Sequence, residues 1–146
     1  MSHTVHPYSH RLGILRDWKS RWFSPKGKFK EYLEADVVIR RYLEKKLKGF
    51  FIADIEIERS QKALRIILST SRPGMIIGRA GDGSQKLLAD VKKLLEKKKL
   101  LPAKVELKLD VKEVKSPESN AAIVAEMVVD GLEKRMPFRR VMKSML

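Results

Sequence analysis

Cysteine is absent from the sequence, which excludes a disulfide framework and a zinc site built on thiolate ligands. No apolar run approaches the roughly 18 residues that are needed to span a bilayer, and no secretory signal core follows Met1. Internal repeats and low-complexity segments are also missing. These absences exclude a disulfide-stapled secreted scaffold and a membrane-spanning protein, so we expect a cytoplasmic location and no membrane partner.

Acidic residues are scarce. The 18 Asp and Glu residues stand against 32 Lys and Arg, which gives a formal net charge of +14 and a pI of about 10.1. An excess of this size indicates a polyanionic partner, most often a nucleic acid, with an anionic membrane surface as the competing interpretation. The 146 residues, 43% of them hydrophobic, suit one folded domain with an extension or with the beginning of another domain.

The residue combinations that mark an enzyme or a metal centre are missing as well. Neither an activated nucleophile nor a pair of carboxylates at catalytic spacing is legible. The loop from Gly78 resembles a Walker A loop, but Ser84 occupies the position of its lysine, and Lys86 stands where a dinucleotide fingerprint has its third glycine. The three histidines lie near the N-terminus without a carboxylate to complete a metal site. We therefore predict no catalytic residue, no metal and no cofactor.

Hydrophobic periodicity predicts an α+β unit in the middle of the chain. The predicted order is helix, strand, strand, helical turn, helix and strand, at residues 29–48, 51–59, 63–70, 73–77, 83–99 and 104–112. Asp82 is the predicted N-cap of the helix from Gly83, with Gln85 completing a capping box. The residues predicted to face the core are Tyr32, Ala35, Ile39, Leu43, Leu47, Ala53, Ile55, Ile57, Leu64, Ile66, Leu68, Leu87, Leu88, Val91, Leu94, Leu95, Val105, Leu107, Leu109 and Val111.

Two more helices are predicted after this unit. Ser116-Pro117-Glu118 signals a helix start, the helix runs from Pro117 to about Arg135, and Pro137 breaks it. A last helix begins at Phe138. At 100° per residue, one side of this helix is apolar and is expected to be buried; it holds Phe138, Val141, Met142, Met145 and Leu146. The other side is basic and holds Arg139, Arg140 and Lys143.

The segment Gly78-Arg79-Ala80-Gly81 lies between the helical turn and the following helix. A GxxG sequence alone is weak evidence, and a plain turn between helices is the alternative. In the order predicted here, however, it is typical of a KH domain, whose GxxG loop clamps a nucleic-acid backbone. Glycines let the backbone approach phosphates closely, the next helix presents free N–H groups to an anion, and Arg79 adds a positive charge.

Three segments together resemble the bacterial third small-subunit ribosomal protein. They are Val5-His6-Pro7 with Arg11-Leu12-Gly13-Ile14, Trp18 and Trp22; the run from Arg72 to Gly81; and Arg135 with Phe138-Arg139-Arg140 and Lys143. This resemblance implies a type II KH fold with a mixed three-stranded sheet backed by helices. It also implies a place in the head of the small ribosomal subunit, beside ribosomal RNA, messenger RNA and the tenth and fourteenth small-subunit proteins.

These observations predict three regions: an RNA- or protein-docking extension at 1–28, a type II KH domain at 29–114, and helices at 115–146 that begin a second domain cut short by the end of the chain. The extension lacks a visible core, so we expect it to need a partner surface to become ordered. The candidate site residues are His6, Arg11, Trp18, Arg21 and Trp22 in the extension, Gly78, Arg79, Ala80 and Gly81 in the loop, and Arg139, Arg140 and Lys143, which the resemblance places where messenger RNA enters.

The predicted function is that of a structural ribosomal protein of the small subunit head. A free-standing KH module, acting as an RNA chaperone or as a regulator of messenger RNA, is the alternative. The tryptophan-bearing extension favours the ribosomal protein, because a free module does not need it.

Overall fold

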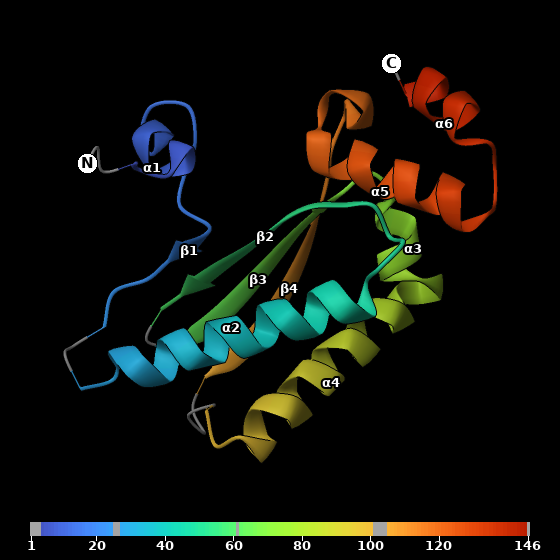
Figure 1. Ribbon diagram of the computed structural model, residues 1–146. Helices are drawn as coiled ribbons and strands as arrows, with labels where there is room; N and C mark the ends of the chain where they lie inside the picture. Colours follow the sequence, from blue (N-terminus) through green and yellow to red (C-terminus); the bar gives the residue numbers. More distant parts are fainter. Residues whose placement is uncertain (1–3, 25–26, 61, 101–104, 146) are drawn as a thin grey trace.

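The computed structural model describes residues 4–24, 27–60, 62–100 and 105–145. Figure 1 shows a sheet with two long helices against one face and helical segments at both ends of the chain. The elements are α1 (Pro7–Arg11), β1 (Ser20–Arg21), α2 (Phe29–Lys46), β2 (Ile52–Arg59), β3 (Ala63–Thr70), α3 (Pro73–Ile77), the 3-10 turn η1 (Arg79–Gly81), α4 (Asp82–Lys97), β4 (Glu106–Glu113), the 3-10 turn η2 (Pro117–Ser119), α5 (Ala121–Glu133) and α6 (Phe138–Met145).

The sheet has the order β1-β2-β3-β4. Strands β2 and β3 are antiparallel, whereas β3 and β4 are parallel, because α3 and α4 form the crossover between them. The expected mixed three-stranded sheet is therefore present. Strand β1 adds a fourth, parallel strand beside β2, with Ser20 opposite Ile57, and the sequence analysis did not predict it. The predicted strand at 104–112 is found from Glu106, and residue 104 lies outside the described residues.

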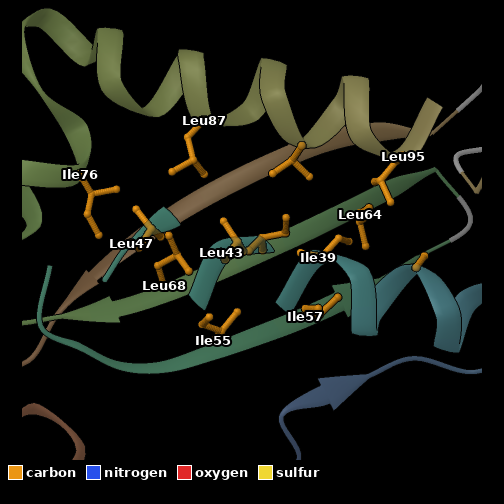
Figure 2. Packing of buried hydrophobic residues seen from close by; sticks show 13 residues of the cluster. Ile39, Leu43, Leu47, Ile55, Ile57, Leu64, Leu68, Ile76, Leu87 and Leu95 are labelled. Carbon is orange, nitrogen blue, oxygen red and sulfur yellow. The ribbon is translucent and has the colours of Figure 1, made fainter. Parts of the chain in front are cut away.

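The core lies between the sheet and helices α2, α3 and α4 (Figure 2). Ile39, Leu43, Leu64 and Leu95 are completely buried in it, as the periodicity predicted. Burying a side chain of this size stabilises the fold by about 1.5–3 kcal/mol. The prediction for Ala53 was wrong: a bulge between Ile52 and Asp54 shifts the register, so Ile52 packs against the core and Ala53 is not part of it.

The other face of the sheet carries charged side chains arranged as ion pairs. Arg21 Nη2 lies 2.6 Å from Glu56 Oε2 and 2.8 Å from Glu58 Oε1, and Arg65 pairs with both Glu58 and Asp110. These pairs neutralise much of the acidic edge that β2 presents. Surface pairs of this kind contribute about 0–1 kcal/mol each, so the apolar face holds the sheet in place.

Two predicted helix starts were wrong. Helix α4 begins at Asp82, whose carboxylate pairs with Lys86 at 2.6 Å, and Gly81 at φ 84° occupies the N-cap position without a side-chain hydrogen bond. Helix α5 begins at Ala121, because Pro117 opens only a 3-10 turn. The Asn120 side chain caps α5, accepting a hydrogen bond from the Ala122 N–H at 3.0 Å.

Helices α5 and α6 pack against each other at a glycine. A Cβ atom on Gly131 would lie 3.0–3.1 Å from the methyl groups of Val141 and from Met136 Cε, so only glycine fits without a shift. Val141 is 1% exposed, but Phe138 and Met142 are 64% and 53% exposed. Of these three residues of the predicted apolar side of α6, only Val141 is buried as expected. Leu146 lies outside the described residues.

Candidate nucleic-acid interface

The glycine loop has the left-handed backbone that its sequence suggests. Gly78, Ala80 and Gly81 have φ values of 71°, 52° and 84°. Glycine adopts this region freely, whereas an alanine there is strained by about 1 kcal/mol. Gly78, Arg79 and Ala80 are exposed, and Gly81 is half-buried. The loop thus presents bare backbone to solvent directly before the first turn of α4.

Gly83 is a positioning residue that the sequence analysis missed. A Cβ atom on it would lie 2.6 Å from the Ile76 carbonyl oxygen and 3.0 Å from that of Ile77. Both contacts are to backbone, so a larger residue would push α4 away from α3. The signal was present as a third glycine in Gly78–Gly83, but the periodicity assigned it only to a helix start.

The electrostatics of the loop favour an anion. Arg79 is exposed and forms no ion pair with any residue that the structure describes. The N-terminal end of α4 adds unpaired N–H groups and a partial positive charge. Asp82 would oppose this field, but its pairing with Lys86 offsets the negative charge. A phosphate group could therefore approach the loop backbone without meeting an unpaired carboxylate of Asp82.

A groove runs beside α4 on the side that faces β4. It is lined by Leu88, Ala89, Lys92, Val105, Glu106 and Leu107. At a rise of 1.5 Å per residue, Leu88 lies about 10 Å along α4 from Gly81. Among the described residues, strand β4 pairs with β3 alone, so its outer edge offers backbone N–H and C=O groups to a ligand in the groove. The periodicity assigned Leu88, Val105 and Leu107 of this lining to the core and did not predict the groove.

Two of the predicted extension residues lie against the folded domain. The Trp22 ring is 5.4 Å from that of Phe29 and 5.7 Å from that of Tyr32, between ring centroids. Its Nε1 donates a hydrogen bond to Asp36 Oδ2 at 2.7 Å. Arg21 reaches the carboxylates of β2 described above. Helix α2 and strand β2 provide the surface on which these two residues lie.

Asp36 is the missed residue at this junction. It is 3% exposed on α2, and its Oδ1 accepts a hydrogen bond from Arg59 Nη2 at 3.1 Å. Arg59 also stacks over the Tyr32 ring at 4.3 Å. A buried carboxylate requires such partners, since an unpaired one costs several kcal/mol. Its position on the inner side of a periodic helix was the available signal.

The other extension residues point to solvent or serve local structure. The His6 imidazole accepts a hydrogen bond from the Tyr8 N–H and caps α1, and Arg11 donates to the Pro7 carbonyl. Trp18 is 59% exposed.

Within the described residues, no group of three or more His, Asp or Glu side chains is placed to hold a metal ion. Across the same ranges, no helix has both the length and the apolar character needed to cross a bilayer.

Arg139, Arg140 and Lys143 are all exposed on α6. None of the three forms an ion pair with a described residue, and Arg139 lies 5.8 Å from the ring centroid of its neighbour Phe138. They stand apart from the extension: Figure 1 shows α1 and α6 on opposite sides of the molecule. The predicted site residues therefore form separate surfaces and not a single site.

Comparison with known proteins gives a consistent result. A family model described as "KH domain" matches residues 38–119. Over 144 residues, the chain is 44% identical to the small ribosomal subunit protein uS3 of Caldicellulosiruptor bescii, which covers 99% of this chain and 62% of that protein. The protein of the same name from Xanthomonas oryzae pv. oryzae is 43% identical, over 98% of this chain and 55% of the relative.

A third relative of that name, from Clostridium perfringens, is 39% identical over 99% of this chain. These matches confirm the resemblance to the bacterial third small-subunit ribosomal protein, and the element order from α2 to β4 confirms the expected fold. The chain spans about three fifths of the length of the curated relatives it matches.

Proposed function

Because the chain belongs to the KH domain family, we propose that it binds RNA as a structural protein of the small ribosomal subunit. The observation that carries this proposal is the 44% identity, over 99% of the chain, with a protein named for that subunit. The charge of +14 supports a polyanionic partner. The function is non-enzymatic in this proposal, and its place is the cytoplasmic ribosome.

The proposed RNA-binding surface is the exposed loop Gly78–Gly81 together with the groove beside α4. The loop would hold phosphates through its backbone N–H groups and through Arg79, as helix N-termini do. The bases would then lie along the groove, against Leu88 and Leu107 and within reach of the Lys92 ammonium group. Backbone contacts carry no sequence information, so this loop fixes the position of the RNA and not its sequence.

The extension has a divided role in this proposal. Trp22 and Arg21 attach it to the KH domain, and His6, Arg11 and Trp18 remain for contacts with small-subunit ribosomal RNA and with neighbouring proteins. The tenth and fourteenth small-subunit proteins are the proposed neighbours. Trp18 supports this, because a large aromatic side chain that is 59% exposed suits base stacking or a protein contact.

The loop is tested with the variant Arg79→Asp/Ala80→Asp. Asp tolerates the left-handed backbone, so the fold is expected to persist. The control Val37→Asp/Arg41→Asp removes the same net charge from the exposed side of α2. Filter binding to small-subunit ribosomal RNA at several salt concentrations should show at least about tenfold weaker affinity for the loop variant than for the control. Equal affinity of the two variants would remove the loop from the proposal.

Sedimentation separates the two candidate functions. A tagged chain should migrate with small subunits at moderate salt if it is a ribosomal protein. Migration in light fractions together with messenger RNA would favour the free-standing KH chaperone or regulator instead. The exposed Trp18 and the additional strand β1 favour the ribosomal protein.

We also propose that Arg139, Arg140 and Lys143 grip the backbone of messenger RNA as it enters the subunit. Their support is exposure on one helix without an internal acidic partner among the described residues. Cations spaced along a helix hold single strands and bias a duplex toward opening. Ribosomes carrying alanine at all three positions should be slower only on a message with a stable hairpin. Equal slowing on a message without a hairpin would contradict this role.

A further inference from the structure

The longest segment without a basic residue lies in the C-terminal part of this basic chain. Residues 116–133 hold neither Lys nor Arg, although the chain has 32 of them, and they carry four acidic residues, Glu118, Glu126, Asp130 and Glu133. Helix α5 occupies most of this segment. Its surface is therefore acidic although the chain as a whole is basic, and it would repel the phosphates that the loop attracts.

The same helix exposes apolar side chains beside its acidic ones. Val129 is 44% exposed and Leu132 is 47% exposed. A hollow of about 310 Å³ lies between α5 and the turn after α2, and it is lined by Lys48, Gly49, Ala125, Glu126, Val129, Asp130 and Glu133. We call these lining residues, together with Leu132, the α5 surface. In Figure 1, α5 lies above the end of the sheet and α4 lies below it.

The carboxylates of the α5 surface are unequally paired. Glu133 Oε1 lies 2.9 Å from Lys48 Nζ, and Asp130 Oδ2 lies 2.6 Å from Lys134 Nζ. Glu126 forms no ion pair with a described residue, and its buried Oε2 has no hydrogen-bond partner there. A buried oxygen does not meet a docking partner directly, but the Glu126 carboxylate adds a negative charge that no described cation pairs.

We propose that the α5 surface docks a basic polypeptide segment of another protein, with an apolar side chain in the hollow and lysine or arginine over the carboxylates. Charge complementarity supports this occupant, because three carboxylates and one lysine line the hollow, and the negative charge that remains attracts cations and repels RNA. A merely solvated helix face would carry polar residues at the positions of Val129 and Leu132. The proposed contact joins two polypeptides and involves no RNA, so it is independent of the RNA-binding function and is measured without RNA.

The test uses the whole chain and two fluorescent amphipathic peptides of about 15 residues that share their leucine positions. One peptide has arginine and lysine at the polar positions, and the other has glutamate. Fluorescence anisotropy should give at least about tenfold tighter binding of the basic peptide, which corresponds to about 1.4 kcal/mol. This preference opposes the net charge of the chain, so a nonspecific effect would have the reverse sign.

Two variants and two matched controls locate the contact. Val129→Ser and Asp130→Asn/Glu133→Gln should each weaken binding of the basic peptide about fivefold or more. Val37→Ser and Glu31→Gln/Glu34→Gln make the same chemical changes on α2, where Val37 is 38% exposed, and should leave binding unchanged. Circular dichroism verifies that all four variants fold.

Several outcomes would overturn the proposal. One is equal affinity of the chain for the two peptides, and another is an equal loss of affinity for the basic peptide in the α5 variants and the α2 controls. A third is that Val129→Ser weakens binding of an oligouridylate but not of the basic peptide. The last result would make α5 an RNA surface. Self-association that the α5 variants abolish, seen by analytical ultracentrifugation without peptide, would instead assign the surface to a second copy of the chain.

Discussion

The two flanks of the KH domain are attached in opposite ways. The N-terminal flank is polar and basic, yet Trp22 reaches a carboxylate that is 3% exposed and Arg21 bridges two strand residues. The C-terminal flank is the more apolar one, yet Val129, Phe138 and Met142 are exposed on it. The C-terminal flank thus keeps exposed apolar side chains, although Ile123 of α5 is completely buried.

The difference lies in the kind of contact. A single hydrogen bond to a buried charge is worth about 1.5–3 kcal/mol and has one geometry, so a few residues can fix a segment. Apolar helices gain stability in proportion to the area they bury, and α6 fully buries only Val141 among its described residues. The apolar surface that remains is available to a partner.

The largest effect is expected for Trp22→Ala. This change removes two ring contacts and one of the hydrogen bonds to buried Asp36, so the free energy of unfolding should fall by about 3 kcal/mol. For a chain of this size the melting temperature should fall by about 10 °C. Trp22→Phe should lose about half as much, because the ring contacts remain.

Trp18→Ala is the matched control, since Trp18 is 59% exposed and its ring contacts no described aromatic side chain. Its effect on stability should be within about 0.5 kcal/mol. Equal losses of stability at Trp18 and Trp22 would show that the extension is held by general hydrophobic contact.

Deletion of residues 1–28 should likewise destabilise the domain, because Asp36 and Arg59 would lose their cover.

An intermediate effect is expected for Gly131→Ala. The added methyl group meets Val141 and Met136 at 3.0–3.1 Å. Overpacking costs about 1–3 kcal/mol, and the better helix propensity of alanine returns up to about 1 kcal/mol. The net loss should be about 1 kcal/mol, and hydrogen exchange should localise it to α5 and α6.

The double variant Gly131→Ala/Val141→Ala serves as its control, because a smaller residue at 141 makes room for the new methyl group. It should lose less stability than the sum of the two single variants. Additive losses, or faster exchange in β3, would show that the helix pair is not a separate packing unit.

Much of the fold was predictable because one physical signal dominates it. Strand β3 matches its predicted bounds, and α2 was placed within two residues, since their apolar residues recur at a fixed period. Strand β1 was missed because two residues carry no period and are paired by a distant strand. The bulge at Ala53 and the start of α4 depend on register and on a glycine N-cap, which composition does not reveal.

The candidate site was predictable only where it is local in sequence. Residues Gly78–Gly81 were identified because a loop motif is contiguous, and the structure gives Gly78, Ala80 and Gly81 a left-handed backbone. The groove joins α4 to β4, which are not contiguous in sequence, and three of its lining residues, Leu88, Val105 and Leu107, had been assigned to the core. Asp36 and Gly83 carry only weak local signals, an inner position on a periodic helix and a third glycine, and their roles depend on tertiary neighbours that these signals do not reveal.

The smallest effect is expected for Asp17→Asn, which tests whether surface charge helps to anchor the N-terminal flank. A hydrogen bond from the Trp18 N–H and the pairing with Arg21 hold the pKa of Asp17 below its ordinary value of 3.8. A lowered pKa stabilises the fold above pH 3.8, and this contribution is lost as the pH falls through the lowered value.

In the variant, asparagine keeps an acceptor for the Trp18 N–H, and Arg21 keeps its ion pairs with Glu56 and Glu58. The melting temperature at pH 7 should therefore fall only slightly, far less than for Trp22→Ala, and the difference from the parent should vanish as Asp17 of the parent becomes protonated. A loss at pH 7 comparable to that of Trp22→Ala, or a difference that persists in acid, would mean that the ion pairs and not the buried contact hold this flank.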